Sequence, residues 1–354
     1  MADDTEGRSP PDLDERLDED EPARLQPDWP PELAAPLKPF AGAEPPAPAW
    51  FAEALAQPPD RRLIQVAGAN IERLAWGEVG NPGLMLVHGN SAHADWWSYI
   101  APFLAQGRRV AAISLSGMGG SDWRDRYDFP TYAEEIFAVA KDAGLYEAET
   151  KPVFVGHSFG GAQVFYSAAL HPERMAGVIL VDSSLGALGT EAQRAEWARV
   201  AAIAGRPHPG PIQRTRPNRV YPALEEALAR FRLSPPQVPG NLFAADFIAR
   251  RSLRPAPLPD APGTGWTWKF DPFLWRKLER TELASLPKDR LPPLVDIIAD
   301  RSALVPLRQA GEISLYVPPG TPSIVIPNSE HHIMVDQPLA LVAALNAVLA
   351  VWPA

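Results

Sequence analysis

Short apolar runs alternate with longer segments of helical pattern along most of this chain. A run of three to five apolar residues with no polar alternation is typical of a strand that is buried on both faces of a sheet. Such strands, separated by helices, predict a mostly parallel, doubly wound α/β sheet with helices on both faces. The runs that read as such strands are 84–87, 110–113, 153–155, 178–181, 294–298 and 324–326. Residues 63–66 and 71–76 read as a pair of strands joined by a turn at Gly68-Ala69-Asn70.

The segments between these runs predict the helices that cover the sheet. Helical patterns occupy residues 95–106, 131–143, 160–170 and 338–349. Thr131 is followed three residues later by Glu134, which is the pattern of a capping box, so the second of these helices is expected to begin at Thr131.

The alternation stops near residue 185 and resumes near residue 287, which divides the chain into regions. Residues 62–185 and 287–354 form the predicted α/β core, and residues 186–286 are rich in Pro, Arg and Trp, with helical patches at 191–204, 222–232 and 272–279. An insertion of this length between two strands of one sheet predicts a helical cap domain. Residues 1–48 alternate acidic runs with Pro-Pro pairs and are expected to form a disordered arm.

Composition narrows the function classes. Residues 1–21 hold ten acids and two bases, a net charge of −8, which leaves −2 for the rest of the chain. The globular part is therefore nearly neutral, and charge predicts neither a nucleic-acid nor a membrane partner. The chain has no cysteine, which excludes disulfides and thiolate chemistry. It lacks a secretory signal and any long apolar span, so a soluble cytoplasmic protein is expected.

The stretch Gly156-His157-Ser158-Phe159-Gly160-Gly161 lies between a predicted strand and a predicted helix. A serine at such a tight bend has strained backbone angles, and the flanking chains approach so closely that only small residues fit around it. The bend exposes the hydroxyl at the carboxyl edge of the sheet. Ser158 is therefore the candidate nucleophile.

An oxyanion hole is expected beside this serine. His88-Gly89-Asn90 follows the 84–87 strand, where the second anion-stabilising donor is expected. The main-chain N–H groups of Asn90 and Phe159 are the predicted donors, and each such donor is typically worth about 3–4 kcal/mol in the transition state. His88 is expected to be structural and to bond to the loop backbone.

With these motifs the chain resembles the α/β-hydrolase superfamily, in the capped branch that includes esterases, lactonases, C–C bond hydrolases, epoxide hydrolases and haloalkane dehalogenases. The resemblance covers roughly residues 62–354 and includes the stretch Ser116–Ser121. Similar enzymes usually have an aspartate two residues before this stretch, where this chain has Ser114. Epoxide hydrolases and dehalogenases use Asp as nucleophile, so Ser158 argues against both activities.

The resemblance places the general base after the last strand, where His331 and His332 both qualify. Related sequences commonly carry the histidine seven residues before a proline. Counting back from Pro338 gives His331, which is preferred over His332.

The third member of the triad departs from the usual pattern. Most relatives carry the acid after the penultimate strand, where this chain has Ser302, which cannot carry a negative charge. Other relatives place the acid after the strand that precedes the cap, and Asp182 is found there. Asp182 is therefore predicted to orient His331. Asp300 is the alternative, and a turn-capping role is the alternative for Asp182.

These residues predict a serine hydrolase of carboxylic esters or lactones that works through an acyl-enzyme. An apolar, including aromatic, small-molecule substrate is expected from the aromatic residues of the cap and of the pocket mouth, which are Trp96, Trp97, Phe159, Trp197, Trp266, Trp268 and Trp275. A C–C bond hydrolase acting on a vinylogous diketone and a catalytically silent small-molecule receptor are the alternatives. No phosphate loop, dinucleotide fingerprint or metal-ligand motif is visible, so no cofactor or metal is expected.

Overall fold

An eight-stranded sheet forms the centre of the part of the chain that the computed structural model describes. The described residues are 30–183, 216–259, 261–279, 281, 283–305 and 317–352. In sheet order the strands are β1 (Asp60–Val66), β2 (Ala69–Trp76), β4 (Arg109–Ser114), β3 (Gly83–Val87), β5 (Val153–His157), β6 (Gly177–Val181), β9 (Leu294–Ala299) and β10 (Ser323–Ile326). Strand β2 is antiparallel to β1 and β4, and every other pair is parallel. The predicted α/β class is confirmed.

Strands β3, β4, β5 and β6 are buried along their whole length. The reason is that an apolar core lies on each face of the sheet. Leu84 and Leu86 belong to one core, and Met85 of the same strand belongs to the other. Successive side chains of a strand point to opposite faces, so two apolar layers require a run without polar alternation.

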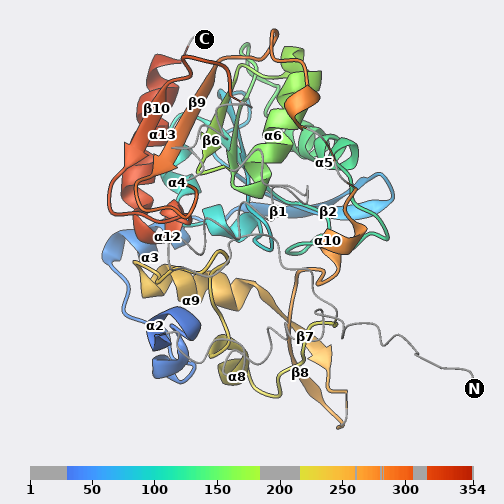
Figure 1. Cartoon of the computed structure of the whole chain (residues 1–354), viewed down its shortest axis with the longest axis vertical. Coiled ribbons are helices and arrows are strands. Elements are labelled where there is room, and N and C mark those ends of the chain that lie inside the picture. The colour runs from blue at the N-terminus through green and yellow to red at the C-terminus, as the bar shows by residue number, and fades with distance from the viewer. Residues whose placement is uncertain are drawn as a thin grey trace, which may run out of the picture.

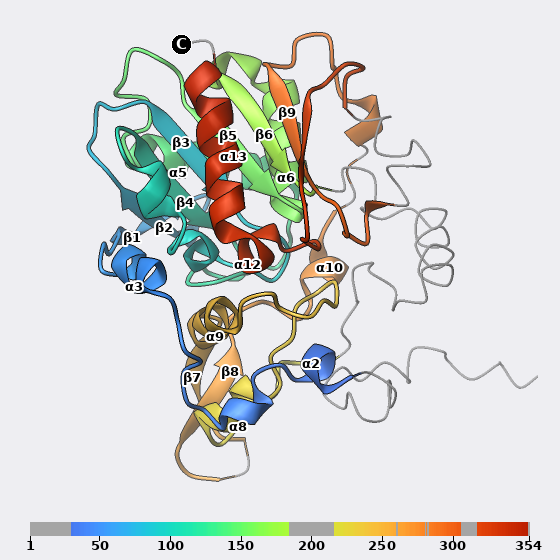
Figure 2. The same cartoon turned by 90° about the vertical axis from the view of Figure 1, so that its left-hand side faces the viewer.

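Helices cover both faces of the sheet (Figure 1 and Figure 2). Helices α4 (Ala101–Leu104) and α13 (Pro338–Val351) contribute to the core on one face. Helices α5 (Phe129–Asp142) and α6 (Phe159–Leu170) contribute to the core on the other. This arrangement exposes the carboxyl ends of the parallel strands to the segments that carry the site.

Two of the predicted helices differ from the observed ones. The second helix begins at Phe129 rather than Thr131, because the side chain of Asp128 caps it by accepting the Thr131 N–H at 2.7 Å. The predicted helix over 95–106 is divided into a 3-10 turn at Ala94–Trp97 and the short α4. The carboxylate of Asp95 is buried there and accepts hydrogen bonds from Ser98 and Arg61, which holds the chain in a turn.

The insertion between β6 and β9 lies beyond one end of the sheet, beside α12 (Ile333–Asp336) (Figure 1 and Figure 2). Its described elements are α8 (Leu224–Leu228), α9 (Leu242–Arg251), β7 (Leu253–Pro257), β8 (Thr264–Trp268) and α10 (Leu274–Lys277). The β7–β8 hairpin was not expected, because Pro255 and Pro257 argue against a strand. A hairpin edge tolerates them because its outward N–H groups have no ladder partner. The predicted helix at 191–204, with Trp197, lies outside the described residues.

The prediction of a disordered arm over residues 1–48 is wrong for residues 30–48, and residues 1–29 lie outside the described residues. The chain forms α2 (Pro31–Ala34), and Leu37 is only 2% exposed in the core. The carbonyl of Gly42 accepts a hydrogen bond from Arg250 of the insertion at 2.7 Å. The proline-rich composition hid Leu37, and the bond to Arg250 ties the segment to α9. The next helix is α3 (Ala49–Leu55).

Among the described residues, no helix combines the length and the apolar character that crossing a membrane requires.

Candidate active site

Ser158 occupies the bend between β5 and α6, with φ +52° and ψ −119°. Few residues other than glycine adopt such angles, and strain of this kind is typical of functional sites. The Ser158 N–H donates to the Val181 carbonyl at 3.1 Å, and the Ser183 hydroxyl donates to the Ser158 carbonyl at 2.7 Å. These two bonds tie the bend to the end of β6 and hold the strained backbone.

The glycines around Ser158 are required by close approach of the backbone, as predicted. A Cβ at Gly156 would lie 2.5 Å from the Cα of Gly161, and a Cβ at Gly160 would lie 2.3 Å from the His88 carbonyl oxygen. Both distances are shorter than any real Cβ contact, and backbone atoms on both sides leave no space for adjustment. Any larger residue would displace the nucleophile.

His331 lies between β10 and α12, and its ring faces Ser158. Its Nε2 atom is 2.8 Å from the Ser158 hydroxyl oxygen. The His331 side chain is buried, whereas Ser158 is partly exposed. The structure thus brings the predicted base to the predicted nucleophile and leaves the nucleophile accessible.

Asp182 completes this line from the far side of the imidazole. Its Oδ2 atom is 2.7 Å from His331 Nδ1, and its Oδ1 atom accepts the Ala299 N–H at 3.2 Å. The residue is fully buried at the end of β6 and has a φ of +40°. A carboxylate at this place fixes the imidazole so that Nδ1 carries the proton and Nε2 can accept one.

Ser302, at the position where relatives usually carry the acid, contacts the same carboxylate. Its hydroxyl donates to Asp182 Oδ2 at 2.5 Å and accepts the Leu304 N–H at 3.1 Å. The accepted bond orients the hydroxyl hydrogen toward Asp182. Ser302 therefore stabilises the negative charge on a neighbour instead of supplying it.

The two alternative residues occupy other environments. Asp300 is exposed, and its carboxylate accepts the Ser329 N–H at 3.1 Å rather than contacting His331. The His332 ring packs against Trp96 with the ring centroids 5.3 Å apart. The main chain turns between His331 and His332, so the two neighbouring side chains point to different partners.

The two predicted oxyanion donors lie at the ends of elements that meet at Ser158. Asn90 follows β3, and Phe159 is the first residue of α6, so its N–H has no acceptor within the helix. Gly89, in the loop after β3, packs closely against the nucleophile bend, because a Cβ at this position would be 3.2 Å from Ser158 Cβ and 2.9 Å from His157 Nδ1. The 88–90 loop is thus in contact with the nucleophile bend.

His88 has the structural role that the sequence predicted. Its Nε2 accepts the Leu115 N–H at 3.1 Å, so its Nδ1 carries the proton and donates to the Gly89 carbonyl at 2.6 Å. Complete burial lowers the pKa of His88 to about 3, so the ring is neutral at physiological pH. It connects the 88–90 loop to the end of β4.

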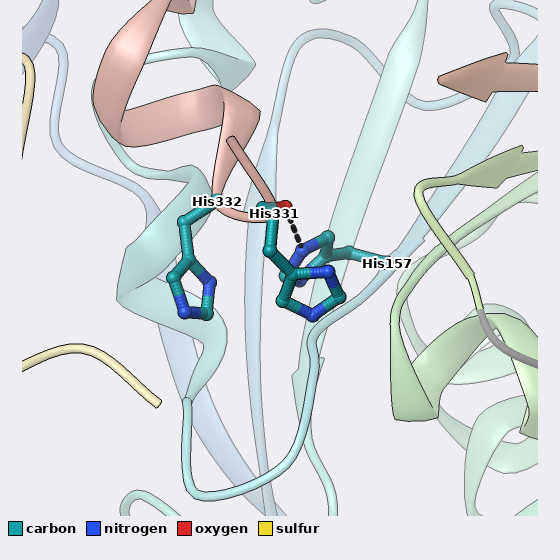
Figure 3. Close-up of side chains that lie close together, drawn as sticks. All are labelled: His157, His331 and His332. Carbon is teal, nitrogen blue, oxygen red and sulfur yellow. Dashed lines mark hydrogen bonds between the residues drawn. The ribbon is translucent and has the colours of Figure 1, made fainter. Parts of the chain in front are cut away.

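Three histidines lie together at the site: His157, His331 and His332 (Figure 3). Ring nitrogens from the three residues lie within 4.8 Å of one another, and imidazoles are ligands that zinc and copper prefer. Both His331 nitrogens, however, are hydrogen-bonded to Ser158 and Asp182. A metal could use His331 only by breaking one of these bonds.

The other two histidines are neutral. Burial, together with the neighbouring His331, lowers the pKa of His157 to about 3. The same two causes, burial first, place the pKa of His332 well below its ordinary value. His157 donates from Nε2 to the His331 carbonyl at 3.0 Å, the contact drawn as a dashed line in Figure 3. His331 is the member of the group whose two ring nitrogens lie between Ser158 and Asp182.

Glu72 is a buried carboxylate that sequence reasoning missed. Its Oε2 atom accepts the Ser114 hydroxyl at 2.7 Å and the Gly120 N–H at 3.0 Å. It thereby holds the 116–121 turn that similar enzymes are expected to hold with an aspartate at position 114. A charged residue inside the apolar strand 71–76 was the available signal.

Aromatic rings border the site from two directions. Trp275 of α10 packs edge-on against Phe159 with ring centroids 5.5 Å apart, and Trp96 contacts His332. Trp96, Trp97, Phe159 and Trp268 are all buried in the hydrophobic cores, and Trp266 is half-buried in β8. Of the predicted aromatic residues, Phe159 directly follows Ser158 and contacts Trp275, and Trp96 contacts the neighbour of His331.

Comparisons with known proteins find relatives among hydrolases. Epoxide hydrolase A of Mycobacterium tuberculosis is 32% identical over 124 residues, which are 34% of this chain and 37% of that protein. Lipase LipV of the same organism is 28% identical over 127 residues, 36% of this chain and 47% of that protein. The chain thus spans between about a fifth and a half of the length of the curated relatives it matches.

The fold is also found among solved structures and in a family model. The structure of E-2-(acetamidomethylene)succinate hydrolase superposes with a TM-score of 0.62 and 19% identity, covering 82% of this chain and 98% of that one. The model of the alpha/beta hydrolase family matches residues 84–345, a range that begins with β3 and contains Ser158, Asp182 and His331. This chain belongs to the alpha/beta hydrolase family.

Proposed function

We propose that this chain is a serine hydrolase of a carboxylic ester or lactone with an apolar substrate. Ser158 is the nucleophile, His331 the general base and acid, and Asp182 the residue that orients His331. The main-chain N–H groups of Asn90 and Phe159 form the oxyanion hole.

One observation carries this proposal, namely the continuous hydrogen-bonded line from Ser158 through His331 to Asp182. Its two links measure 2.8 Å and 2.7 Å, within the range that proton transfer requires. The glycine environment that fixes Ser158 supports the same assignment, because it exposes the hydroxyl at a strained bend. The sequence left a silent receptor as an alternative because Ser302 stands where relatives usually carry the acid. The Asp182 carboxylate contacts both Ser302 and His331, which weakens that alternative.

The reaction follows from these roles. The Ser158 oxygen attacks the substrate carbonyl while its proton moves to His331 Nε2, and the carbonyl oxygen becomes an anion beside Asn90 and Phe159. The C–O bond to the leaving alcohol then breaks, and His331 returns its proton to that alcohol. Water, deprotonated by His331, attacks the resulting acyl-enzyme, and the proton passes back to Ser158 as the acid leaves. A lactone differs only in that the alcohol stays attached to the acyl group.

The surroundings support an apolar substrate. Phe159, which directly follows Ser158, packs against Trp275, and Trp96 packs against the His332 ring next to His331. Binding sites of this kind hold a ligand by apolar area and orient it with few polar groups. Ser158 also argues against epoxide hydrolysis, the activity of one relative, because that chemistry uses an aspartate nucleophile.

A fluorophosphonate probe tests the proposal directly. We expect it to label Ser158 in the native protein, and we expect Ser158→Ala to abolish labelling. A panel of short and bulky aryl esters, lactones and aromatic vinylogous diketones then separates the activities. Turnover of the diketones alone would establish C–C bond hydrolysis, whereas binding without labelling or turnover would establish a receptor.

A further inference from the structure

The peptide between His331 and His332 is held from both sides. Its carbonyl, on His331, accepts the His157 Nε2–H at 3.0 Å. Its N–H, on His332, donates to Oε1 of Gln237 at 2.8 Å. His157 precedes the nucleophile directly in sequence, whereas Gln237 belongs to the insertion. The orientation of this one peptide therefore depends on two separate parts of the molecule.

Gln237 is positioned to act on the histidine loop alone. Its side chain is 2% exposed, and its amide nitrogen donates to Asp336 Oδ2 at 3.0 Å. One buried side chain thus contacts both the peptide beside His331 and the far end of the loop. A buried amide that uses both its donor and its acceptor has one favourable orientation, since each reversed bond would set like groups together.

The residues after Gln237 strengthen the same contact. The Gly240 N–H donates to Asp336 Oδ1 at 3.0 Å, and Asn241 donates to the carbonyls of Val335 and Asp336 at 2.8 and 2.9 Å. A Cβ at Gly240 would lie 2.9 Å from the Asp336 Cα, so the two backbones touch. Hydrogen bonds and backbone contact therefore join segment 237–241 to the loop 330–336.

We propose that Gln237 is a positioning residue for catalysis, through which the insertion sets the placement of the His331 imidazole. It reaches His331 through the clamped peptide and touches neither substrate nor reacting atoms. This inference rests on the proposed role of His331 as the base. It assigns to the insertion a catalytic contribution that is separate from forming a substrate wall.

The test compares Gln237→Met, which keeps the volume but removes both hydrogen bonds, with Asn218→Ala. Asn218 is a matched control because its amide bonds to the carbonyls of Trp268 and Phe270, within the insertion. We expect Gln237→Met to lower kcat and the rate of fluorophosphonate labelling by about tenfold to a hundredfold, since misplacement by about 1 Å has effects of this size. KM should change less than about threefold, and Asn218→Ala should lower Tm without this loss of kcat.

Hydrogen exchange of loop 330–336, measured by mass spectrometry, gives a readout that does not depend on activity. We expect faster exchange in Gln237→Met and unchanged exchange in Asn218→Ala. If Gln237→Met keeps kcat within about twofold while its Tm falls as in the control, Gln237 is only structural and the inference is overturned. If Gln237→Met does not fold, Gly240→Ala takes its place, because its Cβ would push the segment away from Asp336. Absence of labelling in the wild type would refute the proposed function instead, and the exchange data would still report the contact.

Discussion

Replacing Asp182 by asparagine changes a single group in a fully buried environment. In the native protein Oδ2 accepts from His331 Nδ1 and from the Ser302 hydroxyl, and Oδ1 accepts the Ala299 N–H. An amide must place its NH₂ group at one of these two positions. At the Oδ1 position it would face the Ala299 N–H, which sets donor against donor.

The NH₂ group is therefore expected at the Oδ2 position, where it donates to His331 Nδ1. That bond selects the tautomer with the proton on Nε2, which cannot accept the proton of Ser158. The same substitution in a serine protease lowers kcat by about 10⁴. This corresponds to about 5.5 kcal/mol of barrier at about 1.4 kcal/mol for each factor of ten. The opposite rotamer would leave a buried N–H unpaired at a cost of about 1–3 kcal/mol, so turnover through it would still be slower by about tenfold to a hundredfold.

The assay is ester turnover, with circular dichroism and Tm measured first to establish folding. Asp300→Asn is the matched control, because this exposed carboxylate bonds only to the Ser329 N–H and lies away from the imidazole. We expect the control to keep kcat within about tenfold, a barrier change below about 1.4 kcal/mol. A folded Asp182→Asn variant that loses less than tenfold would refute Asp182 as the acid, and an inactive Asp300→Asn would reassign the role.

Two further predictions concern stability. Deleting residues 1–48, compared with deleting 1–29, should lower the free energy of unfolding by about 1.5–3 kcal/mol, because it removes the buried side chain of Leu37; equal urea midpoints would contradict this. The free energy of unfolding should also fall as the pH drops from about 6.5 towards 4. Burial lowers the pKa of His88 and His157 to about 3, and it lowers the pKa of His93 to about 4. Over this pH range the unfolded chain therefore binds protons that the folded chain does not bind. Each of the three contributes a slope of up to about 1.4 kcal/mol per pH unit in urea unfolding, and His93→Asn should remove one such contribution.

The sheet could be predicted from sequence because its strands are short apolar runs that two cores require. All eight predicted strands are present, with ends shifted by a few residues. The insertion was less predictable, since Pro255 and Pro257 argue against the strand that the β7–β8 hairpin stabilises. The docking of residues 30–48 was missed because Leu37 is one apolar residue in an acidic, proline-rich context, and its partner surface exists only after folding.

Some residues of the site could likewise be predicted from the sequence, and others could not. Ser158 was predictable because its bend restricts its neighbours to small residues, a constraint that is visible in the sequence itself. The contacts of Asp182 and Gln237 depend on which segments meet in space, and no local pattern records that. Gln237 in particular lies 94 residues before His331 in a proline-rich segment, where nothing distinguishes it from a surface glutamine.

At positions 114 and 302 this chain has serine where a position-by-position comparison with relatives would expect aspartate. In both cases the carboxylate that contacts the serine lies on the neighbouring strand or directly follows it. Ser114 at the end of β4 donates to Glu72, its register partner on β2. Ser302, which follows β9, donates to Asp182, which follows the adjacent β6. A comparison that scores each position alone would record two lost acids and infer a degenerate enzyme. At both places this chain keeps a carboxylate in contact with the serine hydroxyl, and the carboxylate belongs to the neighbouring strand or follows it.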